Sequence, residues 1–549
     1  MSKMNGNQAL SEMLKGYGVT HVFFMAAIFI RGLIEMDRLG IRPVLAHSEK
    51  AAAYMADGYA RVSHKPGVCF AQSVGAANMA AGLQDPYLGV SPVIALTGTR
   101  PPSHKYKNSY QEVDHKPLYD PVTKFNAEVS TVKELPFLLR QAFREATTGA
   151  PRPVHLDFAG ISGEVITEAE ADLDTTVENQ FSQYPAFRPQ ADNNSVLEAI
   201  RLIGKSSKPV IVAGGGVASS RAQKEVVTLA EKLSIPVAIS LNGKDTIPDN
   251  HPLAIGPVGS YSRKCANQVV AEADLVIFIG SHTGSQVTLD WRIPRPGTAV
   301  IQIDLDPSEL GRNYPSSLCL LGDVKAVVQQ LIDAAKKAEP KKEWIQKVNQ
   351  LLGEWRKESN TLCESDIIPI RPERICKTIG VCLPPNAIVV ADTGNAGIWT
   401  GTTLPITSPQ QNYIRAAGSL GWGFPASLGA KCAAPDRPVV CFTGDGGFWY
   451  HVAELETAAR LGINTVTVVN NNDSLGQVAG GYPFPGQFWK FSTVDFVAVA
   501  ESMGCSGIRV TNPGDLKGAI DKALASNKPM VVDVVSDSKV NPPPAWRPT

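Results

Sequence analysis

The stretch VVCFTGDGGFWYHVAELETAARLGINTVTVVNNNDSLG, residues 439–476, contains the pattern that decides the fold. Two continuous apolar runs, Val439–Phe442 and Thr465–Val469, flank a segment whose apolar residues recur at helical intervals. A helix is predicted there, ending at Gly462, with one apolar face formed by Val452, Leu455, Ala459 and, at its edge, Ala458. Strands that are apolar throughout are covered on both faces, so this order predicts a parallel sheet wrapped by helices.

Polar loops follow both strands of this unit. Gly-Asp-Gly-Gly (444–447) leaves the first strand, and Asn-Asn-Asn-Asp-Ser-Leu-Gly (470–476) leaves the second. Because the carboxyl ends of parallel strands share one edge, we expect the two loops to lie together. Glycines let backbone N–H groups approach a diphosphate, and Mg²⁺ prefers oxygen ligands. Either loop alone is more often a plain turn. Together they predict diphosphate contacts at Gly444, Gly446 and Gly447 and a metal held by Asp445, Asn472 and the Ser474 carbonyl.

Similar strand–helix alternation extends over most of the chain, which predicts an α/β protein built from parallel sheets flanked by helices. Two stretches read as linkers: an acidic and then Gln/Ser/Pro/Asn-rich one from about Glu168 to Asn194, and a charged helical one from about Lys336 to Asp366. They predict three domains, residues 1–170, 190–340 and 365–540. The first and the third have similar strand–helix texture.

Composition excludes several classes of protein. Of 549 residues, 44% are hydrophobic and 19% charged, and 52 Lys and Arg balance 52 Asp and Glu, so nothing favours nucleic acid or an anionic membrane as partner. The nine cysteines form no C-x-x-C pair, which is typical of buried free thiols in a reducing compartment. Met1–Leu10 has no apolar signal core and Val22–Ile30 is too short to span a bilayer, so we expect a cytoplasmic protein.

The G-D-G turn, followed by a helix and N-N, resembles the metal–diphosphate motif of thiamine diphosphate enzymes. The whole chain resembles the superfamily of acetolactate synthase, benzaldehyde lyase and pyruvate decarboxylase, and most closely the large subunit of acetolactate synthase. The resemblance implies a pyrimidine-binding, a central and a diphosphate-binding domain, in that order. It also implies cofactor contacts at Leu475 and Gly476.

The cofactor becomes reactive at its thiazolium C2 only when a carboxylic acid hydrogen-bonds its pyrimidine ring. Glu49 is the candidate, because it precedes a predicted helix, Lys50–Arg61, whose sequence AAAYMADGYAR resembles the family's H-E-x-x-A-x-x-A-x-G-Y-A-R signature. Burial raises the pKa of such an acid and so keeps the proton available. Without this context, a glutamate at a helix start is more often a favourable charge on the helix dipole.

Other positions are carried over from the resemblance. In the segment Arg415–Pro425, the Gly418 carbonyl would accept a bond from the 4′-amino group and Leu420 would wedge the cofactor into a bent shape. Gly394 and Asn395 would contact the diphosphate or the substrate. Gln111, in Tyr-Gln-Glu-Val-Asp, would hydrogen-bond an oxygen of the substrate or an intermediate.

Some segments depart from the family pattern. Met25–Phe29 is wholly apolar where relatives carry a Pro-Gly or His-Gly loop, so it offers no proton donor. Gln477 and the segment 480–486 differ from acetolactate synthases, which puts that enzyme's own substrate in doubt. Asn78 is interpreted as a structural or interface residue. His47, His104 and His115 are each more often packed or surface residues than catalysts.

The central domain raises the question of a second cofactor. Val212–Val217 contains three glycines after a strand but lacks the full G-x-G-x-x-G spacing. In acetolactate synthase this domain binds FAD, and the corresponding loop, Gly280–Gln286, has no arginine here, which argues against FAD. The ADP portion of coenzyme A is an alternative, and a domain with only a structural role is the interpretation that we favour.

The predicted function is decarboxylation of a pyruvate-like 2-oxo acid, after which the resulting enamine is protonated or adds to a second carbonyl compound, an aldehyde or a ketone. The resemblance implies a homodimer or homotetramer, with each cofactor held between the first domain of one subunit and the third of another. Three alternatives stay open: a lyase of acyloins or 2-hydroxyacyl thioesters, a thiamine-dependent oxidase that carries flavin, and a non-catalytic regulatory protein on the same fold.

Overall fold

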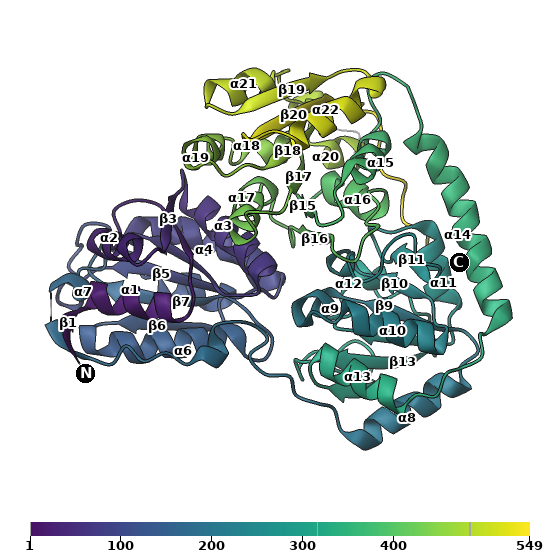
Figure 1. The fold of residues 1–549 in the computed structure, drawn as a ribbon, viewed down its shortest axis with the longest axis horizontal. Helices are drawn as coiled ribbons and strands as arrows, with labels where there is room; N and C mark the ends of the chain where they lie inside the picture. The colour runs from purple at the N-terminus through teal and green to yellow at the C-terminus, as the bar shows by residue number, and fades with distance from the viewer. Residues whose placement is uncertain (1, 169, 316, 482–484, 549) are drawn as a thin grey trace.

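Three six-stranded sheets, each covered by helices, follow one another along the chain (Figure 1). The computed structural model describes residues 2–548 except 169, 316 and 482–484. Every pairing within the three sheets is parallel, as the apolar strands predict. No helix in the described part of the chain combines the length and the apolar character that crossing a bilayer requires. The predicted α/β class with three parallel sheets is confirmed.

The first and the third sheets share one topology, which explains their similar texture in the sequence. The first has the order β3-β2-β4-β5-β7-β6 and the third β16-β15-β17-β18-β20-β19. The strands of the first are β2 (His21–Phe24), β3 (Arg42–Leu45), β4 (Gly67–Ala71), β5 (Val93–Thr99), β6 (Phe125–Val129) and β7 (Val154–Ala159). Those of the third are β15 (Ile388–Ala391), β16 (Asn412–Arg415), β17 (Val439–Gly444), β18 (Val466–Asn471), β19 (Ser506–Val510) and β20 (Met530–Val535).

The central sheet has a different order, β11-β10-β9-β12-β13-β14. Numbered within the domain this is 3-2-1-4-5-6, the order of dinucleotide-binding sheets, although the glycine motif in the sequence is incomplete. Its strands are β9 (Pro209–Ala213), β10 (Val237–Ile239), β11 (Ala254–Pro257), β12 (Leu275–Ile279), β13 (Ala299–Asp304) and β14 (Leu318–Leu321). A ligand of this domain would bind at the carboxyl ends of the strands, in the crevice between β9 and β12, where the strand order reverses.

Helices cover both faces of each sheet. The first domain has α1 (Gly6–Gly16), α2 (Ile30–Arg38), α3 (Glu49–Ser63), α4 (Ser73–Leu88), α5 (Lys116–Tyr119), α6 (Leu135–Thr147) and α7 (Val165–Glu168). The central domain has α8 (Asn193–Lys205), α9 (Gly215–Ser220), α10 (Gln223–Leu233), α11 (Lys264–Glu272), α12 (Ser285–Thr288) and α13 (Val324–Ala334). The third has α15 (Pro372–Cys382), α16 (Asn395–Thr402), α17 (Gly423–Ala433), α18 (Asp445–Trp449), α19 (Glu454–Leu461), α20 (Gly476–Gly481), α21 (Phe496–Ser502) and α22 (Leu516–Leu524).

The structure refines two sequence predictions. The single helix expected after the G-D-G turn is two helices, α18 and α19, and Val452 lies in the turn between them; α19 ends at Gly462, whose φ is +61°. The first linker contains a strand, β8 (Glu170–Leu173), which pairs antiparallel with β1 (Ser2–Asn5). The second linker contains the predicted helix, α14 (Lys342–Cys363), which runs along the outside of the molecule (Figure 1).

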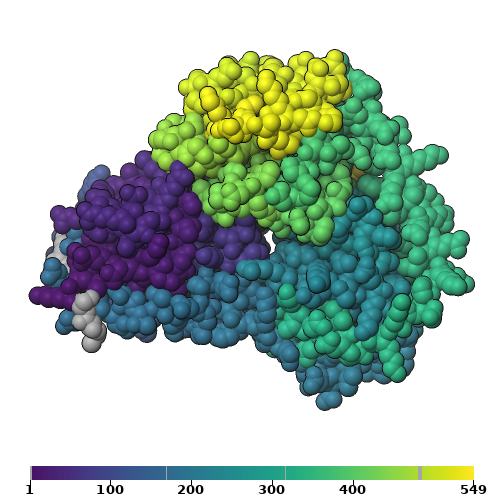
Figure 2. Space-filling view, in the orientation of Figure 1, coloured from purple at the N-terminus to yellow at the C-terminus, as the bar shows by residue number. Residues whose placement is uncertain are grey.

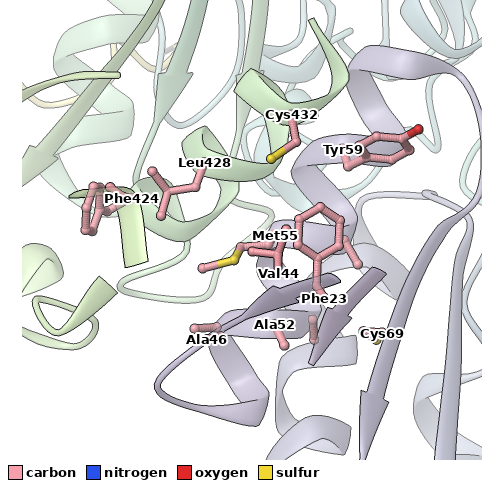
Figure 3. Packing of buried hydrophobic residues seen from close by; sticks show 14 of the residues in the cluster. Phe23, Val44, Ala46, Ala52, Met55, Tyr59, Cys69, Phe424, Leu428 and Cys432 are labelled. Atoms are coloured by element: carbon pink, nitrogen blue, oxygen red, sulfur yellow. The ribbon is translucent and has the colours of Figure 1, made fainter. Parts of the chain in front are cut away.

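The first and the third domains pack against each other through α3 and α17. Figure 3 shows Met55 and Tyr59 of the first domain facing Leu428 and Cys432 of the third in one apolar cluster. A Cβ on Gly429 would lie 1.8 Å from the Met55 carbonyl oxygen, so the helices can approach this closely only because glycine is present. Within one chain, this contact fixes the position of the first domain, which carries Glu49, relative to the third domain, which carries the predicted cofactor-binding residues.

Candidate active site

Asp445 is a buried carboxylate at the junction of β17 and α18. Its side chain is 2% exposed; Oδ1 accepts a hydrogen bond from the Gly446 amide at 2.8 Å and Oδ2 one from the Ser474 amide at 2.9 Å. Burial raises the pKa of Asp445 to about 7 in spite of these two bonds. A carboxylate buried at the ligand edge of a parallel sheet, with no cationic side chain bonded to it in the described chain, is suited to bind a metal ion.

The structure brings together the polar residues predicted on the second loop. Ser474 donates its hydroxyl to Asn472 Oδ1 at 2.8 Å while its amide bonds Asp445. Asn395, at the start of α16, lies beside them: a Cβ on Gly476 would be 3.2 Å from Asn395 Nδ2 and 3.4 Å from Asn472 Nδ2. Among the described residues no group of three or more His, Cys, Asp or Glu could hold a metal. A metal at Asp445 would therefore depend on the amide oxygen and the backbone carbonyl that the sequence predicts.

The glycines of the site have two different roles. A Cβ on Gly446 would lie 2.7 Å from Leu475 Cδ2, and one on Gly447 would lie 2.8 Å from Thr443 Oγ1, so protein packing already explains these two. A Cβ on Gly444 or on Gly418 would meet no atom within 4 Å. The space beside these last two positions is open, as a cofactor that approaches the backbone requires.

Asp392, which the sequence analysis did not select, connects the predicted cofactor segments. It is 1% exposed and accepts four hydrogen bonds, from the amides of Thr393, Gly421 and Gly423 at 2.8, 3.1 and 2.9 Å and from the Thr443 hydroxyl at 3.3 Å. Burial raises its pKa to about 6. These bonds hold the loop before Asn395, the loop after Leu420 and the G-D-G turn in fixed positions. Only its place directly after β15 could have marked it in the sequence.

Glu49 is the first residue of α3, and the helix begins there because the Ser48 side chain accepts a bond from the Ala51 amide at 3.1 Å. Asn78 on α4 donates to Glu49 Oε2 at 3.2 Å. On the same helix, a Cβ on Gly75 would lie 2.4 Å from Glu49 Oε1. Asn78, interpreted from the sequence as a structural or interface residue, thus bonds the predicted catalytic acid directly. The Glu49 carboxyl group, which belongs to α3, is held in place by residues of α4.

Gly418 contacts the other end of α4 through the Asp85 side chain. Asp85, near the C-terminal end of the helix, accepts bonds from the backbone amides of residues 417–419 at 2.9 to 3.2 Å and from Arg61 at 3.2 Å. Asn78 and Asp85 are seven residues apart, which is about 10 Å at 1.5 Å per residue. Within one chain, Glu49 and the Gly418 amide therefore contact separate parts of α4.

Gln111 has a side-chain oxygen ready for a ligand. Its φ is +57°, its backbone carbonyl accepts the Ser73 hydroxyl at 2.8 Å, and its Oε1 is buried without a hydrogen-bond partner in the described chain. In the apolar loop Met25–Phe29, Ala26 and Ala27 are exposed. Phe29 is buried against Phe70 and Phe158, which anchors this loop.

The three histidines occupy different environments. His47 lies at the surface, 2.8 Å from Glu456, and His104 is exposed. His115 is buried and bonds Asp157 at 3.0 Å, with its Nε2 unpartnered in the described chain. The segment that differs from acetolactate synthases includes residues 482–484, which lie outside the described residues.

Three family models cover the chain in the order of the three sheets. Residues 4–118 match the N-terminal TPP binding domain of thiamine pyrophosphate enzymes, residues 196–331 the central domain, and residues 392–534 the C-terminal TPP binding domain. The chain belongs to the thiamine pyrophosphate enzyme family. All the predicted cofactor-contacting residues of the third domain, Gly394 to Gly476, lie inside the third match.

Several curated proteins are similar to this thiamine pyrophosphate enzyme over almost their whole length. A probable acetolactate synthase large subunit of Methanocaldococcus jannaschii is 34% identical over 97% of this chain and 92% of its own. The acetolactate synthase isozyme 1 large subunit of Escherichia coli is 30% identical over 91% and 88%. The acetolactate synthase large subunit of Lactococcus lactis is 30% identical over 97% and 92%.

The residues at the edge of the third sheet fit thiamine diphosphate and a divalent metal. Asp445 is a buried acid whose ionised form a cation would stabilise, and a Cβ on Gly444 or on Gly418 would meet no atom within 4 Å. In this thiamine pyrophosphate enzyme, Asn395 and Asn472 lie next to each other beside Gly476, where a diphosphate between them and the G-D-G turn would meet donors. The donor set, one carboxylate with amide and backbone oxygens, suits Mg²⁺.

A cavity of about 420 Å³ lies where the three domains of the enzyme meet, in the region between the three lobes of Figure 2. It is lined by both glycine-containing segments of the central domain, residues 214–216 and 280–286, and by Arg415 of the third domain. Gly214 and Gly216 are needed for packing, since a Cβ on either would lie within 3 Å of Gly280. The cavity shows that the central domain has room for a ligand.

Proposed function

We propose that this enzyme decarboxylates a 2-oxo acid such as pyruvate and joins the remaining two-carbon unit to a second carbonyl compound, as an acetolactate synthase does. The observation that carries the proposal is the similarity to acetolactate synthase large subunits over 88% to 92% of their length. Glu49 and the buried acid Asp445 lie within the family-model matches at residues 4–118 and 392–534. A regulatory protein on this fold would need neither.

Bound thiamine diphosphate supplies the nucleophilic thiazolium carbon and the electron sink for decarboxylation. Glu49 would hydrogen-bond the pyrimidine nitrogen through its carboxyl group, and the Asn78 amide orients that group. Asp445, Asn472 and the Ser474 carbonyl would hold Mg²⁺ against the diphosphate. Leu420 would support the bend of the cofactor, with Gly394, Asn395 and the Gly418 carbonyl on its sides.

The substrate side would be formed by Gln111 and the apolar loop Met25–Phe29. Gln111 Oε1 needs a hydrogen-bond donor, which a hydroxyl of the substrate or of an intermediate can provide. Ala26 and Ala27 offer only methyl groups, so this wall favours a small apolar substituent such as the methyl group of pyruvate. No proton is transferred by this loop.

We further propose that one active site is built from two chains. Glu49 and Gly418 of one chain contact parts of α4 that are about 10 Å apart along the helix axis, so they would not contact the same pyrimidine ring. A second copy related by a two-fold axis would place its Glu49 opposite Gly418 and Leu420, and the exposed Val74 and Tyr450 would be covered in that interface. The enzyme is then at least a homodimer.

The alternative reactions make different demands. An oxidase would carry flavin and a thioester lyase would require coenzyme A substrates, whereas the relatives described above are named as acetolactate synthases. We propose that thiamine diphosphate and a divalent cation suffice for the carboligation, without FAD.

The test is product identification. Purified protein is incubated with thiamine diphosphate, Mg²⁺ and pyruvate, alone and with aldehydes or 2-oxobutyrate as acceptors, and the products are identified by mass spectrometry. Release of CO₂ together with a carboligated product supports the proposal. Turnover only of acyloins or of 2-hydroxyacyl thioesters would replace it with the lyase function, and yellow protein that consumes O₂ would replace it with the oxidase function.

A further inference from the structure

Another cavity, of about 610 Å³, adjoins the predicted cofactor residues, because Asn395 and Gln477 are part of its lining. Gln477 directly follows Gly476, and a Cβ on Gly394 would lie 3.5 Å from the Gln477 Oε1 atom. The cavity therefore begins at the edge of the third sheet where the diphosphate is expected. Pockets of about 300–1,000 Å³ hold ligands much larger than a three-carbon acid, so this space is not explained by pyruvate alone.

The outer wall of this cavity is apolar and held in place. Ile398 of α16, Trp355 and Leu362 of α14, and Trp546 near the chain end all line it. The chain end lies beside α11 and α14 (Figure 1), and the Trp546 carbonyl accepts a hydrogen bond from Asn267 Nδ2 at 3.0 Å. A wall fixed in this way gives an apolar substituent a preformed surface to pack against.

The charges of the lining do not favour an anion. Lys264 is the basic side chain among the described lining residues, and its Nζ lies 3.6 Å from Glu358 Oε1. Glu373 is 4% exposed; its Oε1 accepts a bond from Arg371 at 2.8 Å and its Oε2 is buried with no donor in the described chain. A carboxylate on the ligand would meet no unpaired cation here and would face Glu373, and burial of an unpaired charge is costly. A neutral ligand fits this lining.

Tyr261 supplies a hydrogen-bond donor at the end of the cavity that is nearest to the cofactor residues. Its hydroxyl oxygen accepts a bond from Gln477 Nε2 at 2.9 Å, and both residues are part of the lining. Because the hydroxyl oxygen is the acceptor of this bond, the Tyr261 O–H is left to donate elsewhere. The oxygen of a carbonyl group held beside Gln477 can accept that bond.

We propose that this cavity binds the second carbonyl substrate, and that this substrate is a neutral aldehyde with an aromatic or branched apolar substituent. The Tyr261 hydroxyl donates to the aldehyde oxygen, and the substituent packs against Trp355, Leu362 and Trp546. This inference rests on the proposed function and names the acceptor that the function leaves open. The reaction joins the carbonyl carbon of pyruvate to the aldehyde carbon, releases CO₂ and takes up one proton from water, so it needs no further reactant.

The test measures kcat/KM for different acceptors with holoenzyme that is saturated with thiamine diphosphate, Mg²⁺ and pyruvate. The acceptors are 4-methylbenzaldehyde, 4-formylbenzoate, propanal and 2-oxobutyrate. The first two have similar shapes and differ in charge. We expect kcat/KM for 4-methylbenzaldehyde to exceed each of the other three values at least about tenfold, because the ring is buried and no carboxylate is desolvated. A value for 4-formylbenzoate or for 2-oxobutyrate as high as that for 4-methylbenzaldehyde would overturn the proposal.

Two variants test the two parts of the cavity. Leu362→Trp narrows the apolar part, so it should lower the ratio of kcat/KM for 4-methylbenzaldehyde to kcat/KM for propanal about tenfold. Leu197→Trp, at a position of α8 that is 59% exposed, is the matched control and should leave this ratio unchanged. Tyr261→Phe removes the donor that both aldehydes use, so it should lower both kcat/KM values about tenfold and keep their ratio.

A binding measurement separates this inference from the proposed function. Holoenzyme without pyruvate is titrated by calorimetry with 4-methylbenzamide, a neutral and unreactive analogue of the aldehyde. Binding that Leu362→Trp weakens, in a protein that forms no carboligated product, would refute the proposed function and support the cavity as a site for neutral apolar molecules. Carboligation with 2-oxobutyrate in a protein that does not bind 4-methylbenzamide would keep the proposed function and refute this inference.

Discussion

Gly75 and Glu49 are in such close contact that a Cβ on Gly75 would lie 2.4 Å from Glu49 Oε1. The two residues come from different helices, α4 and α3, and the Asn78 amide bonds the other carboxyl oxygen at 3.2 Å. The position of the predicted catalytic proton is therefore set by the absence of a side chain at residue 75. This relationship makes the glycine testable separately from the acid.

Replacing Gly75 with Ala should reduce kcat while the protein stays folded. The added methyl group must displace the flexible end of Glu49, which costs little stability but moves the carboxyl group out of position. We expect kcat to fall about 10²-fold, in line with the usual contribution of a positioned acid–base group. Steady-state kinetics and thermal melting check this. Gly204→Ala, where a Cβ would meet nothing within 4 Å, is the control, and equal kcat values for the two variants would contradict the prediction.

Replacing Glu49 with Gln should abolish turnover and leave cofactor binding largely intact. Glutamine has the same shape but cannot give a proton to the pyrimidine ring, so kcat should fall by about 10²–10⁴-fold. Thiamine diphosphate affinity, measured by calorimetry in the presence of Mg²⁺, should change much less. Glu12→Gln, at an exposed position on α1, serves as the control. A fully active Glu49→Gln enzyme would disprove the assignment of Glu49.

The raised pKa of Asp445 predicts how the affinity of the protein for Mg²⁺ depends on pH. Burial raises its pKa from the ordinary value of 3.8 to about 7 in the metal-free protein, so below pH 7 the folded state holds a proton there. Mg²⁺ needs the carboxylate and must displace that proton, so affinity should rise about tenfold per pH unit up to pH 7 and then level off. Titration of Mg²⁺ at several pH values, followed by calorimetry, measures this.

The same pKa predicts the stability of the metal-free protein. Because the folded pKa of Asp445 lies above the unfolded value of 3.8, its contribution to the free energy of unfolding is complete below pH 3.8 and is lost progressively as the pH rises to about 7. Asp445→Asn should remove this dependence and weaken Mg²⁺ binding strongly, whereas Asp436→Asn at an exposed site of the same domain should do neither. Affinity for Mg²⁺ that is independent of pH between 5 and 7 would show that Asp445 is not a ligand.

Two inactive variants should complement each other if each site uses Glu49 from one chain and Asp445 from another. Glu49→Gln and Asp445→Asn subunits are mixed and allowed to exchange, and exchange is verified by native mass spectrometry. Random pairing makes half of the dimers hybrid, each with one intact site of two, so activity should return to about a quarter of the wild-type value. Exchange without any recovered activity would show that the site lies within one chain.

The elements that carry the cofactor motif could be predicted because they are local. The strand before the G-D-G turn, the strand before Asn472 and the helix end at Gly462 all follow from apolar runs and glycines within a few residues. The break between α18 and α19 could not be predicted, because the Glu454 side chain at that break accepts a bond from the His47 amide of another domain. The spacing of apolar residues within one segment does not indicate a hydrogen bond to a residue of another domain.

Some residues around the site were visible only in three dimensions. Asp392 and Asp85 are single acids without a motif, yet each accepts bonds from at least two backbone amides of a segment remote in sequence. Asn78 was assigned a structural role because its motif is incomplete, and the structure places its amide on Glu49. Hydrogen bonds between distant segments have no spacing rule, so no pattern in one chain could have indicated them.

The sequence by itself determined the three α/β units, the family and the chemistry of the loops, because strand hydrophobicity, glycine placement and metal-ligand types depend on the residues themselves. The tertiary structure alone decided that Glu49 and Gly418 contact different parts of α4, and that Arg415 is buried with no carboxylate bonded to it among the described residues. Both are distances between segments brought together by the packing of α3 against α17 and by the meeting of three domains. Such distances depend on how whole domains pack, which a linear pattern of residues does not encode.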